Sequence, residues 1–104
     1  MAQPVVMTDP SDTVSRAVEA VISGRVQGVW YRGWTEGQAK RLGLSGWVRN
    51  NADGTVSALF AGPAGDVANM LALCWQGPDS AEVSGVATRE VTPVPPSQGF
   101  EILR

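Results

Sequence analysis

The residues best suited to chemistry lie between Ile22 and Arg32, a stretch that reads ISGRVQGVWYR. An alternating apolar run from Val18 ends at Gly24, and a helical pattern begins at about Tyr31. The spacing therefore predicts a strand, a tight loop and a helix. Successive N–H groups in such a loop, together with the unpaired N–H groups at the helix start, form a concave site that favours an anion.

Arg32 falls in the first turn of the predicted helix. The helix dipole disfavours a cation there by a few tenths of a kcal/mol, up to ~1 kcal/mol, so another interaction is expected to hold it. A guanidinium can bind a phosphate or a carboxylate through two parallel hydrogen bonds. The loop taken alone is equally compatible with a solvated surface arginine beside an ordinary turn.

Asn50 is the second candidate, at the point where a predicted strand meets its hairpin connection. The connection is Asn51-Ala52-Asp53-Gly54, and asparagine is common in such places simply as a turn former. Taken alone, Asn50, Asn51, Asp53 and Gly54 therefore have a structural explanation.

Composition limits the other possibilities. The chain has 104 residues, 43% of them apolar and 17% charged, with a formal charge of −2, which is typical of one small globular domain. An acidic chain without a basic cluster is not expected to bind nucleic acid or an anionic membrane. Without a long apolar segment or a secretory signal, we expect a cytoplasmic protein.

The single cysteine and the absence of histidine restrict the chemistry further. One cysteine excludes an internal disulfide, and the absence of histidine removes the commonest general base and metal ligand. We expect no metal and no cofactor, and any reaction must use arginine, asparagine, carboxylates, backbone amides or the substrate itself.

Alternating and helical periods predict the elements that position these residues. Residues 1–16 have no sustained period and are expected to be a flexible extension, and residues 17–104 to form the domain. The predicted order is a strand from Ala17, a helix over about Tyr31–Leu42, strands over Ser45–Asn50 and Thr55–Ala61, a helix over about Pro63–Trp75, a strand over Glu82–Val91 and a short strand with Phe100 and Ile102.

Apolar stripes on both helices are expected to face the core: Tyr31, Thr35, Ala39 and Leu42 on the first, and Val67, Met70, Leu71 and Cys74 on the second. Cys74 is then a buried hydrophobe. Gly33 and Gly37 are expected where the first helix approaches the sheet, or as tolerated weak points. Trp34, Trp47 and Trp75 are expected in or beside the core, and Trp30 either packs there or lines the mouth of the site.

The order β-α-β-β-α-β with an extra terminal strand predicts an α+β fold. Two helices covering one face of a mainly antiparallel sheet form a ferredoxin-like α/β sandwich.

Two motifs in the chain resemble those of the acylphosphatase family. The first is the aliphatic-x-G-x-V-Q-G-V-x-aromatic-R stretch from Ile22 to Arg32, and the second is Gly46-Trp47-Val48-Arg49-Asn50 followed by Gly54, Val56 and Gly62. The resemblance covers about residues 17–104. One departure is Tyr31, where the family usually has phenylalanine, so its hydroxyl needs a partner.

The resemblance implies that Arg32 binds the phosphate and that Asn50 orients the attacking water. It also implies a phosphate cradle formed by the backbone N–H groups of Arg25, Val26, Gln27, Gly28 and Val29. The implied reaction is metal-independent hydrolysis of a small-molecule acyl phosphate to a carboxylate and inorganic phosphate, by a protein expected to be monomeric.

Two other interpretations remain open. One is a ferredoxin-like module that binds an anion or a partner without hydrolysis, since this fold supports many functions. The other is a stand-alone relative of the acylphosphatase-like domain found in larger carbamoyl-phosphate-handling enzymes, which the lack of a cysteine-rich continuation after Arg104 disfavours.

Overall fold

A computed structural model describes residues 14–104 and contains two helices and five strands. The first strand begins at Ser15 rather than at Ala17, and most of the predicted extension, residues 1–13, lies outside the described residues. The elements are β1 (Ser15–Arg25), α2 (Tyr31–Arg41), β2 (Ser45–Asn50), β3 (Val56–Pro63), α3 (Ala64–Cys74), β4 (Glu82–Glu90) and β5 (Phe100–Ile102).

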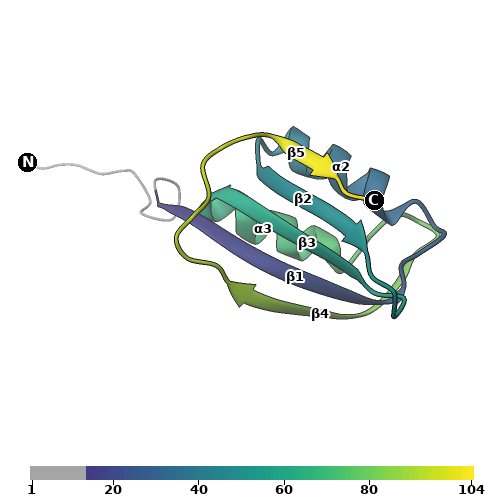
Figure 1. Ribbon diagram of the computed structural model, residues 1–104. Helices are drawn as coiled ribbons and strands as arrows, with labels where there is room; N and C mark the ends of the chain where they lie inside the picture. The colour runs from purple at the N-terminus through teal and green to yellow at the C-terminus, as the bar shows by residue number, and fades with distance from the viewer. Residues whose placement is uncertain (1–13) are drawn as a thin grey trace, which may run out of the picture.

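The strands form one sheet in the order β4-β1-β3-β2-β5, and both helices lie against the same face of it (Figure 1). All neighbouring pairs are antiparallel except β2 and β5, which are parallel. The predicted ferredoxin-like sandwich with an additional terminal strand is therefore confirmed. Neither helix is long and apolar enough to cross a membrane, among the residues that the structure describes.

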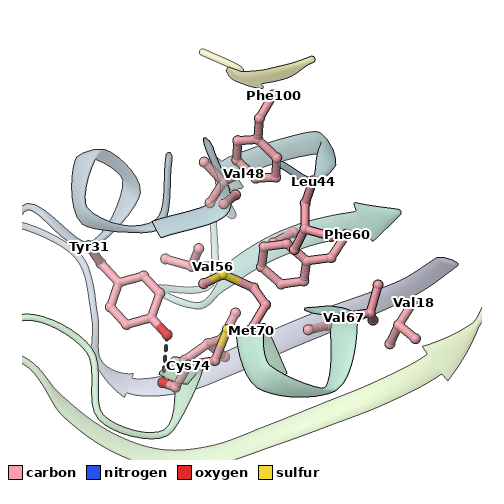
Figure 2. Packing of buried hydrophobic residues seen from close by; sticks show 14 of the residues in the cluster. Val18, Tyr31, Leu44, Val48, Val56, Phe60, Val67, Met70, Cys74 and Phe100 are labelled. Carbon is pink, nitrogen blue, oxygen red and sulfur yellow. Dashed lines mark hydrogen bonds between the residues drawn. The ribbon is translucent and has the colours of Figure 1, made fainter. Parts of the chain in front are cut away.

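The core lies between the sheet and the helices, and the predicted stripes form it. From the sheet, Val18, Val56 and Phe60 are fully buried, and the Phe60 ring stacks on Phe100 with 5.7 Å between ring centroids (Figure 2). Most of the residues predicted on the two helix stripes are buried: Tyr31, Thr35 and Ala39 from α2, and Val67, Met70 and Cys74 from α3. The other two, Leu42 and Leu71, are partly buried and pack against the core.

Tyr31 joins the two helices. Its hydroxyl donates a hydrogen bond of 2.7 Å to the carbonyl of Cys74, the last residue of α3 (Figure 2). The final carbonyls of a helix have no partner within the helix, so this bond satisfies one of them. Burial raises the pKa of the Cys74 thiol to about 12, which agrees with its prediction as a buried hydrophobe.

The prediction for Trp75 is wrong. Its side chain is 54% exposed, because α3 ends at Cys74 and the next residue points away from the apolar stripe. Trp34 and Trp47 are half-buried, and Trp34 packs against the core as expected.

The sheet register brings the two candidate stretches to one end of the molecule. Ile22 of β1 and Asn50 of β2 both pair with Val56 of β3, so they are level with each other across one intervening strand. Two strand spacings amount to roughly 10 Å. The loop that follows β1 and the turn that follows β2 therefore emerge side by side (Figure 1).

We expect the substitution Tyr31→Phe to lower the free energy of unfolding by about 1–3 kcal/mol. It keeps the buried ring but removes the hydroxyl that donates to the Cys74 carbonyl. Urea denaturation followed by circular dichroism measures the change. A variant as stable as the parent chain would show that this hydrogen bond contributes nothing to stability.

Candidate active site

The loop between β1 and α2 presents a series of free donors. Within residues 14–104, none of the N–H groups of residues 26–33 donates a hydrogen bond, and the first bond of α2 runs from the Trp34 N–H to the Trp30 carbonyl. Gly28 has a φ of +75°, a left-handed conformation that glycine adopts without strain. This turn and the helix start together form the type of concave amide surface that binds anions.

Arg32 lies in the first turn of α2, as predicted, and is half-buried. Its Nη1 atom donates a hydrogen bond of 3.4 Å to the carbonyl of Leu103, beyond the end of β5. The first turn of α2 contains no acidic residue, so no carboxylate of that turn neutralises the guanidinium or the helix N-terminus. The helix start therefore combines two sources of positive potential.

Gln27 connects this loop to the turn after β2. Its Nε2 atom donates hydrogen bonds of 2.8 Å to both the Asn51 carbonyl and the Thr55 carbonyl. The family resemblance implied a role in the site only for the backbone N–H group of Gln27. The side-chain role could not be found from spacing, because it depends on how two distant segments approach each other.

The turn after β2 is stabilised by its own polar side chains, as expected if Asn51 and Asp53 serve as turn formers. Asn51 Nδ2 donates to Thr55 Oγ1 (2.9 Å) and to Ser57 Oγ (2.7 Å). Asp53 Oδ1 accepts from the Thr55 N–H (3.0 Å) and from its hydroxyl (2.6 Å), and these bonds lower the pKa of the Asp53 carboxyl. Asn50, which immediately precedes this turn, is exposed, and within residues 14–104 its carboxamide forms no hydrogen bond.

A pocket of about 280 Å³ opens between the loop, the first turn of α2 and the ends of β2 and β5. It brings Arg32 and Asn50 together, along with Val26, Gln27 and Gly28 of the predicted cradle, whereas Arg25 and Val29 are not among its lining residues. The remaining lining residues are Trp30, Tyr31, Gly33, Ile102 and Arg104. Of the residues from 14 to 104, two arginines and no acidic side chain line it, so the pocket favours an anion even though the whole chain carries a net charge of −2.

Ile102 and Arg104 were missed as pocket residues. They reach it because β5 pairs in parallel with β2, which sets Ile102 beside Val48, two residues before Asn50. A short terminal strand gives no local indication of which neighbour it will pair with, so the sequence pattern could not have placed these side chains.

The glycines of α2 do not mark an approach to the sheet. A Cβ atom at Gly37 would have no neighbour within 4 Å, so Gly37 is the tolerated weak point that the sequence allowed. A Cβ atom at Gly33 would lie 2.2 Å from the indole Nε1 of Trp30. Gly33 is therefore required by the position of Trp30.

Fold and pocket together define a small ferredoxin-like α+β protein with a cationic pocket at one end of its sheet. Residues 18–102 match the family model of acylphosphatases. The chain thus belongs to the acylphosphatase family, as its two motifs predicted.

Individual relatives agree with this assignment. An acylphosphatase of Rhodospirillum rubrum is 60% identical over 81 residues, which are 76% of this chain and 86% of that protein. An acylphosphatase of Rhizobium meliloti is 52% identical over 89 residues, 86% of this chain and 94% of that protein. The solved structure of an acylphosphatase from Coxiella burnetii superposes with a TM-score of 0.82 at 30% identity, covering 86% of this chain and 93% of that one.

We expect the substitution Gln27→Leu to lower the free energy of unfolding by about 1–3 kcal/mol, because two hydrogen bonds of about 0.5–1.5 kcal/mol each are lost. The loss should stay within this range because the carbonyls of Thr55 and Asn51 retain backbone donors, the N–H groups of Asn51 and Gly54. Urea denaturation measures it, with Gln76→Leu at an exposed position as the control. Equal stability of the two variants would contradict a bridging role.

Proposed function

We propose that this pocket hydrolyses the bond between the carboxyl oxygen and the phosphorus of small acyl phosphates, and releases a carboxylate and inorganic phosphate. The observation that carries the proposal is the convergence, in one pocket, of a half-buried guanidinium with N–H donors and a carboxamide that have no hydrogen-bond partner among residues 14–104. Phosphoryl transfer needs little covalent chemistry from a protein and is accelerated mainly by positioning and charge stabilisation, which such groups can supply.

The phosphoryl oxygens are held by Arg32 and by the loop. The guanidinium can bind two of them in parallel, and the N–H groups at the start of α2 add further donors that need no reorganisation. In this proposal the backbone donors are those of Val26, Gln27 and Gly28, which line the pocket, flanked by those of Arg25 and Val29, which do not. Negative charge spreads over these oxygens in the transition state, so donors fixed around them lower the barrier.

Asn50 orients the attacking water in line with the bond that breaks. Its carboxamide has both a donor and an acceptor available, so it can fix the position of a water molecule and the direction of its lone pair. As the water oxygen bonds to phosphorus, the bond from phosphorus to the carboxyl oxygen breaks and its electron pair leaves with the carboxylate. The carboxylate needs no protonation to depart, and the proton of the water passes to a phosphate oxygen.

The proposed reaction needs no metal ion. Among the residues that the structure describes, the side chains that line the pocket include no aspartate, glutamate, histidine or cysteine, which are the usual protein ligands of catalytic metals. Charge neutralisation is assigned to Arg32 instead. A cytoplasmic location and a monomeric state stay predictions of the sequence.

Two substitutions test the assigned roles. Arg32→Gln should weaken inhibition by inorganic phosphate and lower kcat/KM for benzoyl phosphate by about 10³-fold or more, as expected for a catalytic arginine in phosphoryl transfer. Asn50→Ala should lower kcat while leaving the phosphate inhibition constant within about twofold, because it orients water rather than phosphate. Steady-state kinetics with phosphate as a product inhibitor measure both.

Arg41→Gln, on the last turn of the same helix, is the matched control and should retain parental kinetics. Near-parental turnover in Arg32→Gln or Asn50→Ala would remove that residue from the mechanism. Saturable phosphate binding by the parent chain without any turnover would instead support the non-catalytic, anion-binding interpretation.

Metal independence has its own test. After dialysis against EDTA, phosphate release from benzoyl phosphate should continue at the untreated rate, because the groups that neutralise the phosphate are part of the chain. Loss of activity that returns on addition of Mg²⁺ or Zn²⁺ would contradict the metal-free site.

A further inference from the structure

Trp30 is unusual in both backbone and exposure. It has a φ of 68° and a ψ of 23°, and it is the one residue other than glycine with a positive φ among residues 14–104. Bulky side chains rarely adopt this left-handed conformation, and such strain concentrates at functional sites. The side chain is also 71% exposed, so burial in the core does not compensate for the conformation.

The indole ring of Trp30 rests on the first turn of α2. A Cβ atom at Gly33 would lie 2.2 Å from its Nε1 atom and 2.6 Å from its Cε2 atom. Any other residue at position 33 would therefore displace the ring. The left-handed backbone of Trp30 directs the ring to this place, and the missing side chain of Gly33 leaves room for it.

The ring faces the same pocket as the catalytic groups. Trp30 and Gly33 line the pocket together with Arg32 and Asn50, and Arg32 is only two residues further along the chain. In the proposed complex the phosphoryl group is held at Arg32, and the acyl group is attached to it through a single oxygen. The acyl group therefore lies within reach of the indole.

Trp30 supplies the large flat apolar surface of an otherwise cationic and polar pocket. The other apolar and aromatic side chains lining it are smaller or covered, because Val26 and Tyr31 are buried and Ile102 is half-buried. An aromatic ring that stacks on the indole would bury apolar area on both partners and gain from the favourable arrangement of two π systems. An acetyl group is too small to cover the ring.

We propose that Trp30 is a specificity-determining residue, and that its indole stacks on the acyl group of aromatic acyl phosphates and favours them over short aliphatic ones. This inference rests on the proposed function, because it places the phosphoryl group at Arg32. A ring that served only to hold the loop would change the hydrolysis of both kinds of substrate in the same proportion.

The test compares kcat/KM for benzoyl phosphate with kcat/KM for acetyl phosphate. Trp30→Gly should fold at least as stably as the parent chain, because glycine is favoured at this φ, and should lower the benzoyl-to-acetyl ratio about tenfold. Trp30→Phe should retain most of the preference because it keeps a stacking ring. Gly33→Ala should lower the ratio by displacing the indole, and should have no further effect on the ratio in the Trp30→Gly background.

Gly37→Ala, on the same helix with open space around it, is the control for Gly33→Ala and should leave the ratio unchanged. A ratio within twofold of the parental value in Trp30→Gly, with acetyl phosphate still hydrolysed, would overturn this inference and leave the proposed function intact. Failure of the parent chain to release phosphate from either substrate would overturn the proposed function itself.

Discussion

The site depends on the two hydrogen bonds that the Gln27 carboxamide donates across the end of the sheet. They join the loop after β1 to the turn after β2. Without them, β3 would separate these two segments, because β1 and β2 pair with opposite edges of it. Because Asn50 immediately precedes that turn, the same bonds limit how far its carboxamide can move from the loop donors. A reaction catalysed by positioning needs such a constraint, since small displacements of the water or the phosphoryl group cost large factors in rate.

The electrostatics of the site follow from its place in the fold. The start of α2 carries the positive end of the helix dipole and N–H groups that have no acceptor within the described part of the chain, and Arg32 adds a full charge to the same turn. On an isolated helix this arrangement would be unfavourable. It is tolerated here because the Leu103 carbonyl accepts a hydrogen bond from the guanidinium, and because a bound anion would convert the repulsion into attraction.

The periodic spacing of apolar residues predicted the strands and helices of the fold. The alternating strands, both apolar helix stripes and the position of Arg32 at the helix start were evident from spacing, and two long motifs indicated the family. What they could not predict depends on packing between distant segments: the parallel pairing of β5 that brings Ile102 and Arg104 to the pocket, and the side-chain bridge of Gln27. The exposure of Trp75 was mispredicted because the residue after Cys74 points away from the apolar stripe, which ends with the helix at Cys74.

The proposed reaction requires the loop amides and the Arg32 guanidinium to bind a phosphoryl group. A titration of the ¹⁵N-labelled chain with inorganic phosphate, followed by two-dimensional NMR, tests it most directly. Saturable shifts are expected for the backbone N–H signals of residues 25–29 and for the Arg32 side-chain Nε–H. The signals of Thr88, Arg89 and Glu90 should stay unchanged, because they lie at the end of β4 that pairs with the start of β1, away from the loop. Shifts that do not saturate, or that gather on another surface while the loop signals stay in place, would contradict it.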